Sequence, residues 1–107
     1  DPSCNPYLAF AAMLAAGLDG VRNQIDPPNP VTGNVYRMSE RERTRNKIKS
    51  LPGNLGEALV AFEKSSVLKE ALGTHASQQF LTAKHAEWRE YIAAVHPWEL
   101  DRYLTSM

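Results

Sequence analysis

The order of apolar and polar residues along the chain predicts a protein built mainly from α-helices. The first helix is apolar on every side, because "YLAFAAMLAAGL" (residues 7–18) contains no charged side chain. Asn5 is a good N-cap for this helix and Pro6 suits its first turn. Apolar positions at helical spacing continue beyond it, so we expect the helix to run to about Asn23, before Pro27 stops it.

Residues 26–53 are predicted to form an irregular surface connector. It opens with "DPPNPVTGN", which holds three prolines and one glycine. Within the connector, Ser39 and Glu42 have the spacing of a capping box, which predicts a short exposed helix over residues 40–45. That helix is marginal because it lacks apolar side chains to bury.

Three helices are predicted within residues 54–95. A capping pattern at Asn54 precedes an amphipathic helix with apolar residues at positions i, i+3, i+4 and i+7. These apolar residues are Leu55, Ala58, Leu59 and Phe62. A second short helix is expected over residues 66–72, followed by a long helix that Thr74 or Ser77 can cap.

The last predicted helix lies in residues 96–107 and carries a small apolar face. Pro97 ends the long helix and can also open this one. The apolar face consists of Trp98, Leu100, Tyr103 and Leu104. Because no segment shows persistent strand alternation or a hairpin turn, the predicted fold class is mainly α.

The apolar helix within residues 1–25 is expected to be buried, although not by this chain alone. Its large side chains point around the whole circumference, so about half of them would face outward in a small bundle. Leaving that half in water forfeits on the order of 5 kcal/mol, comparable with the net stability of a small domain. Gly17 and Gly20 also favour close approach by a neighbouring backbone. We therefore expect an oligomer or a piece of a longer chain, and self-association of the isolated piece.

Composition and charge exclude several classes of function. Twelve basic and twelve acidic residues cancel among 107 residues, so no overall field recruits nucleic acid or an anionic membrane. The single Cys4 cannot form an internal disulfide, which favours a cytoplasmic location. The apolar run is too short to span a bilayer, and Asp1 stands where a signal peptide would be basic. A start at Asp1 instead of Met also indicates that part of the chain has been removed.

The histidines, the paired glutamates and the basic segment are better explained by surface or packing roles than by catalysis or ligand binding. The three histidines lack the spacing of metal ligands, so we expect capping, surface or packing roles for His75, His85 and His96. Glu87 and Glu90 lie near basic residues on one helix, where surface pairing explains them. The basic segment over residues 37–49 could bind phosphate or nucleic acid, but a solvated face is the preferred interpretation. None of these residues is therefore assigned an acid–base or metal-binding role.

Several separated motifs together resemble the C-terminal end of type I glutamine synthetase. They include "DPSCNPYLA", "AGLDG" and "VHPWELDRYL", and the resemblance covers essentially all 107 residues in order. It implies a helical C-terminal segment of an α+β catalytic domain. The implied enzyme joins glutamate and ammonia through γ-glutamyl phosphate, using ATP and Mg²⁺ or Mn²⁺. The family's metal ligands and substrate arginines lie earlier in its chain. We therefore expect no catalytic, cofactor-binding or metal-binding residue in this piece, which would be structural and inactive.

The resemblance also implies partners. The family forms a dodecamer of two stacked six-membered rings, and its C-terminal helix enters a hydrophobic recess of the opposing ring. The inter-subunit residues implied here are Trp98, Leu100, Tyr103 and Leu104. Tyr36 aligns with a tyrosine that is adenylylated in one subtype, but Arg37, Met38 and Ser39 replace the residues that follow it there. We therefore expect the subtype of Gram-positive bacteria and archaea, which is regulated by feedback and protein partners.

Two alternatives stay open at this point. One is a paralogue that ligates glutamate to a polyamine, because the choice of amine is made upstream of these residues. The other is a stand-alone helical interaction module that docks a regulator through the basic segment or the tail.

Overall fold

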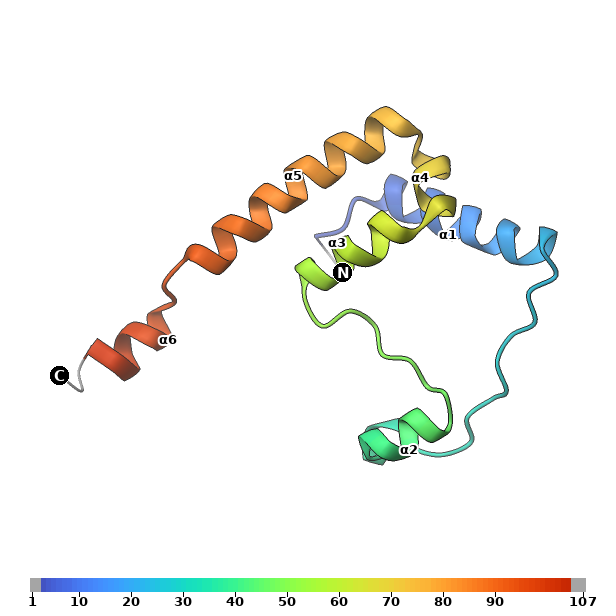
Figure 1. Ribbon diagram of the computed structural model, residues 1–107, viewed down its shortest axis with the longest axis horizontal. Helices are drawn as coiled ribbons and strands as arrows, with labels where there is room; N and C mark the ends of the chain where they lie inside the picture. The colour runs from blue at the N-terminus through green and yellow to red at the C-terminus, as the bar shows by residue number, and fades with distance from the viewer. Residues whose placement is uncertain (1–2, 105–107) are drawn as a thin grey trace.

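In the computed structural model, which describes residues 3–104, the chain forms helices joined by one long connector (Figure 1). In chain order the elements are α1 (Pro6–Arg22), η1 (Val35–Arg37), α2 (Glu40–Arg45), α3 (Leu55–Lys64), α4 (Ser66–Leu72), α5 (Thr74–Ala93), α6 (Pro97–Glu99) and the π-helical turn η2 (Leu100–Leu104). No strand occurs within residues 3–104, which confirms the mainly α fold class. Residues 1–2 of the predicted first segment and 105–107 of the predicted tail lie outside the described range.

The predicted N-caps of three helices are present. The side-chain oxygens of Asn5, Ser39 and Asn54 accept hydrogen bonds from backbone N–H groups in the first turns of α1, α2 and α3. In α2 the capping box is reciprocal: Glu42 N–H donates to Ser39 Oγ at 3.3 Å, and Ser39 N–H donates to Glu42 Oε2 at 2.8 Å. Local capping chemistry therefore sets where these helices begin.

Helices α1 and α2 end in the same way, with a left-handed residue after the C-cap. Gln24 has a φ of 50° and Lys47 a φ of 56°, although this position favours glycine. After Lys47, the Ile48 N–H donates to the Arg43 carbonyl oxygen at 2.9 Å, which closes a Schellman motif.

Helices α3 and α5 run side by side in opposite directions, with α4 at the end that joins them (Figure 1). The Phe62 and Phe80 rings meet between α3 and α5, with centroids 5.6 Å apart. Nearer the other end of α3, Trp88 of α5 covers Gly56 of α3. Leu59 is the one apolar side chain classed as buried among residues 3–104, so the core of this chain is very small.

Helix α1 packs against α4 but is not enclosed by this chain. None of its residues is buried, and Tyr7, Phe10 and Met13 keep 84%, 70% and 70% of their surface exposed. A Cβ atom added at Gly17 or Gly20 would meet nothing within 4 Å, so the neighbour expected beside these glycines is not in the described chain. Burial of this helix stays a prediction about other parts of a larger protein.

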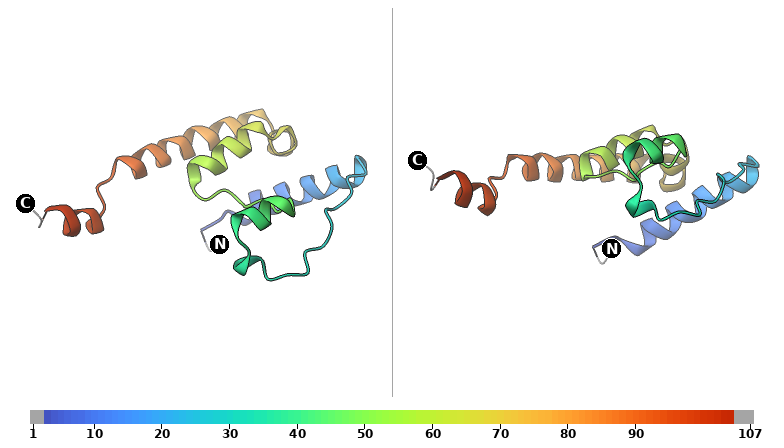
Figure 2. Two further views of the ribbon diagram at one scale, coloured as in Figure 1. Left: turned by 60° about the horizontal axis from the view of Figure 1, so that its bottom comes forward. Right: turned by 90° about the horizontal axis from the view of Figure 1, so that it is seen from below.

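The overall dimensions agree with a chain that does not enclose its own apolar surface. Its radius of gyration is 18.6 Å, whereas a compact chain of this size has about 13 Å. The accessible surface is 9653 Å², whereas a compact monomer of this mass exposes about 6,000 Å². Two further views show α6 and η2 standing clear of the other helices (Figure 2).

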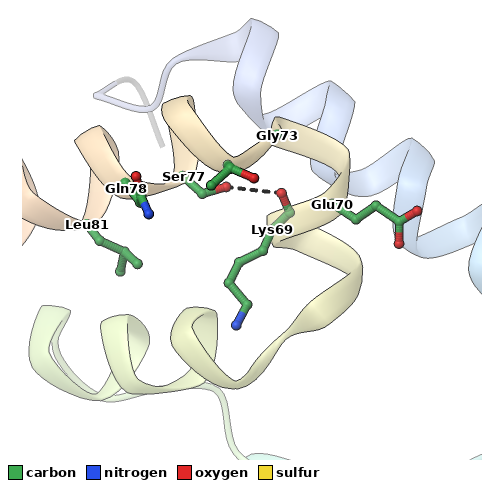
Figure 3. A pocket seen from close by; sticks show the side chains of 7 residues that line it. Lys69, Glu70, Gly73, Ser77, Gln78 and Leu81 are labelled. Carbon is green, nitrogen blue, oxygen red and sulfur yellow. Dashed lines mark hydrogen bonds between the residues drawn. The ribbon is translucent and has the colours of Figure 1, made fainter.

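The start of α5 differs from the prediction, because neither Thr74 nor Ser77 caps it. Gly73 is its N-cap, with a φ of 75°, and no side chain makes a capping hydrogen bond there. The Ser77 hydroxyl is buried and donates instead to the carbonyl oxygen of Lys69 in α4, at 3.2 Å (Figure 3). The prediction was wrong because one glycine both ends α4 and begins α5, which turns Ser77 toward α4.

Candidate functional site

The structure separates the two groups of residues that the sequence analysis singled out. The candidate inter-subunit residues lie together at the far end of the chain, in α6 and η2 (Figures 1 and 2). Tyr36 lies in η1, within the connector and close in sequence to α2. These residues therefore form two surfaces and not one site.

The terminal helix begins at a proline and, with the turn that follows it, forms what we call the tail. Pro97 occupies its first turn, and the N–H of His96 donates to Glu99 Oε2 at 2.9 Å. Residues 100–104 then continue as a π-helical turn. Such wide turns are rare and often occur at functional sites.

Four exposed apolar side chains define what we call the tail cluster: Trp98, Leu100, Tyr103 and Leu104. Their exposed fractions are 63%, 43%, 58% and 72%, respectively. The rings of Trp98 and Tyr103 meet edge to face, with centroids 6.1 Å apart. The Arg102 guanidinium carbon lies 5.5 Å from the centroid of the Trp98 ring. An exposed apolar surface on a short projecting helix is typical of a segment that docks into a groove.

A column of three rings, which the sequence analysis missed, lies where the tail leaves α5. The Trp88 and Tyr91 rings stack, with centroids 5.6 Å apart and planes inclined by 22°. The Tyr91 and His96 rings lie 5.1 Å apart, across the break between α5 and α6. The spacing of Trp88 and Tyr91, three residues apart on a helix, was a usable signal for the first contact.

The surface around Tyr36 is polar and open. The Tyr36 side chain is fully exposed, at 101%, and its backbone N–H donates to Asn34 Oδ1 at 3.0 Å. In the adjoining α2, hydrogen bonds from the backbone N–H and hydroxyl of Ser39 hold the pKa of Glu42 below its ordinary value of 4.5. That Tyr36 is not modified stays a prediction.

Two pairs of ionisable side chains on α5 and α3 are ordinary surface contacts. His85 Nε2 lies 2.8 Å from Glu63 Oε1 and joins α5 to α3, and Lys84 Nζ lies 2.5 Å from Glu87 Oε2. The pairing of Glu87 confirms the surface role predicted for it. Within residues 3–104 no three His, Cys, Asp or Glu side chains are grouped so that they could hold a metal ion. None of the helices in that range is long and apolar enough to cross a membrane.

An open hollow of about 470 Å³ lies at the corner between α4 and α5 (Figure 3). Its lining includes the Ser77 side chain, whose hydroxyl is already bonded to the α4 backbone. Lys69 and Glu70 also line it, from α4. This hollow is a feature of the helix corner and brings no set of reactive groups together.

Comparison with known proteins gives a consistent set of matches. Residues 1–103 match the model of the glutamine synthetase catalytic domain. The chain is 55% identical over 106 residues to glutamine synthetase of Thermus thermophilus and 52% identical over 107 residues to that of Methanosarcina mazei. It is 51% identical over 104 residues to glutamine synthetase of Thermotoga maritima. These alignments cover 97–100% of this chain but 24% of each relative, so the chain spans about a quarter of their length.

Proposed function

Because the chain belongs to the glutamine synthetase family, we propose that it is the C-terminal helical part of a glutamate–ammonia ligase. The whole protein would use ATP to join glutamate and ammonia through γ-glutamyl phosphate. The observation that carries this proposal is the match of residues 1–103 to the catalytic-domain model. The names of the relatives favour ammonia over a polyamine as the amine substrate.

The chemistry would take place outside this chain. Phosphoryl transfer needs cations and positive side chains that neutralise developing charge. Residues 3–104 hold no group of side chains suited to a metal ion. ATP and Mg²⁺ or Mn²⁺ would therefore bind to the rest of the protein.

The test compares the whole protein with the isolated chain. With glutamate, ATP and Mg²⁺, the whole protein should release phosphate in response to ammonia and not to putrescine. The isolated chain should release none. A preference for putrescine would favour the polyamine ligase, and no ligase activity in the whole protein would contradict the proposal.

The role of the chain within that enzyme is to pack the catalytic domain and to join subunits. Its surface exceeds that of a compact monomer by about 3,700 Å², several times the roughly 800 Å² that one partner buries in a standard interface. The rest of the enzyme would cover α1, and the tail cluster would enter a recess on a subunit of the opposing ring in a dodecamer. A regulatory protein would be a further partner of the exposed surface of this chain.

The contact between rings is tested by Trp98→Ala in the whole enzyme. Loss of a large aromatic anchor from an interface lowers its stability, so the variant should dissociate at a higher protein concentration in sedimentation velocity. Arg89→Ala, at an exposed position on α5, serves as the control and should sediment like the parent enzyme. Unchanged sedimentation of Trp98→Ala would contradict the proposed role of the tail cluster.

Tyr36 would remain unmodified in this enzyme. The basic residue at position 37 and the polar Ser39 differ from the sequence that follows the modified tyrosine of the other subtype. The mass of the proteolytic peptide containing Tyr36, taken from the native host, tests this. A peptide heavier by one adenylyl group would contradict it.

A further inference from the structure

The direction of the tail is set at a break of three residues between α5 and α6. Helix α5 ends at Ala93, and the N–H of its C-cap, Ala94, donates to the carbonyl oxygen of Glu90 at 3.1 Å. Ala94 and His96 have extended backbones, with ψ of 130° and 147°. Pro97 favours this at His96, since the α region is disfavoured for a residue before proline. The break separates the tail cluster from the α3–α5 pair.

Side-chain rings span this break. The Tyr91 ring, on the last turn of α5, lies 5.1 Å from the His96 ring at the start of the tail. The His96 N–H in turn donates to Glu99 Oε2, and its carbonyl oxygen accepts from the N–H groups of Glu99 and Leu100. A shift of His96 would therefore carry the first turn of the tail with it.

The column is anchored at its other end on α3. The Trp88 indole stacks on Tyr91 and also lies over Gly56, where an added Cβ atom would come within 2.7 Å of Trp88 Nε1. The rings of Trp88, Tyr91 and His96 thus connect α3, α5 and the tail in one continuous series. We call this series the aromatic column.

We infer that the aromatic column holds the tail in the direction in which it docks, so that Tyr91 and His96 are positioning residues for the subunit contact. This inference rests on the proposed role of the tail cluster. Fixing a segment in its bound direction before binding reduces the entropy lost on association. Tyr91 would therefore strengthen the contact by acting through the tail, without being part of the tail.

The test uses sedimentation velocity of the whole enzyme with substitutions at Tyr91. Tyr91→Ala removes the ring that pairs with both Trp88 and His96, and loss of the pair with His96 should weaken association about two- to tenfold. Tyr91→Phe keeps the ring and should associate like the parent, and Arg89→Ala is the matched control on the same helix. Because the Tyr91 side chain is more than half exposed, Tyr91→Ala should lower the melting temperature of the separated subunits only slightly, which distinguishes positioning from loss of folding.

A double-mutant cycle distinguishes this inference from the proposal that the tail cluster docks on the opposing ring. If Tyr91 acts through the tail, Tyr91→Ala should have little further effect in enzyme that already carries Trp98→Ala. Equal effects in both backgrounds, or no effect of Tyr91→Ala where Trp98→Ala weakens association, would overturn the inference alone. No effect of Trp98→Ala would overturn the proposed tail contact and the inference with it.

Discussion

Lys47 has a left-handed backbone conformation that glycine adopts at lower cost. Its φ of 56° lies at the end of α2, where the following Ile48 N–H closes a bond to Arg43. Left-handed backbone costs a residue with a Cβ atom roughly 1–2 kcal/mol, part of which is offset by the greater freedom of glycine when unfolded. We expect Lys47→Gly to stabilise this turn by about 0.5–1 kcal/mol.

The measurement for Lys47→Gly is amide hydrogen exchange at Ile48. Its exchange should slow about two- to fivefold in the glycine variant, because the turn opens less often. Lys47→Ala is the control, since it removes the same side chain but keeps the Cβ atom. If alanine slows exchange as much as glycine does, the lysine side chain and not the backbone was responsible.

Glu42 gives the first turn of α2 a dependence on pH. Ser39 bonds to its carboxylate and lowers its pKa below 4.5 in the folded chain. The contribution to stability is therefore present above pH 4.5 and is lost as pH falls through the lowered value. The protection factors of the α2 amides, which are exchange rates corrected for the pH dependence of the unfolded chain, should fall over this acid range in the parent. Glu42→Gln, which can cap without ionising, should remove the dependence, and Glu40→Gln should retain it; a dependence that survives Glu42→Gln would contradict this account.

Among elements, the pairing of α3 with α5 depends on the absence of a side chain at Gly56. Three atoms of the Trp88 indole lie within 3.0 Å of where a Cβ atom would stand. Although alanine favours a helix more than glycine does, the displaced indole should outweigh this. We expect Gly56→Ala to destabilise the pair by about 1–2 kcal/mol.

Exchange of the α3 amides tests the Gly56→Ala prediction. A loss of that size should quicken their exchange about 5- to 30-fold. Gly53→Ala is the matched control, because its Cβ atom would meet only Glu57 Oε2, at 3.6 Å. Slower exchange in Gly56→Ala would mean that the indole moves aside at no cost and helix propensity decides the outcome.

The limits of helices were more predictable from the sequence than the contacts between them. Asn5, Ser39 and Asn54 were recognised as caps because capping acts within four residues along the chain. The bond from Ser77 to Lys69 crosses between two helices, and no spacing rule indicates it. The contact of Trp88 with Gly56 likewise depends on the angle between α3 and α5, which the sequence pattern does not specify.

For the whole molecule, the exposed apolar surface predicts association of the isolated chain. Its surface of 9653 Å² includes most of α1, on which no residue is buried. In water such surfaces favour mutual contact. Light scattering across a range of concentrations should therefore give a mass that rises above that of one chain. A constant monomer mass at high concentration would show that the chain rearranges to cover α1 itself.

The candidate site was predictable in part from the sequence. The four residues of the tail cluster stood out because they form an apolar face beside a proline at the end of the sequence. The burial predicted for residues 1–25 depends on neighbours outside this chain, which spans about a quarter of the length of its relatives. The ring of His96 gave no signal, since its contact with Tyr91 depends on the bend between two helices.

The connector over residues 26–53 is not the only link between α1 and the later helices. Helix α1 packs directly against α4, on the far side of the connector in sequence (Figure 1). In the whole enzyme, where α1 would contact α4 and also the parts proposed to cover it, a protease nick in this loop should leave two fragments that remain bound until a denaturant separates them. The loop is, for the same reason, a suitable place to split the gene and express the enzyme as two complementing polypeptides.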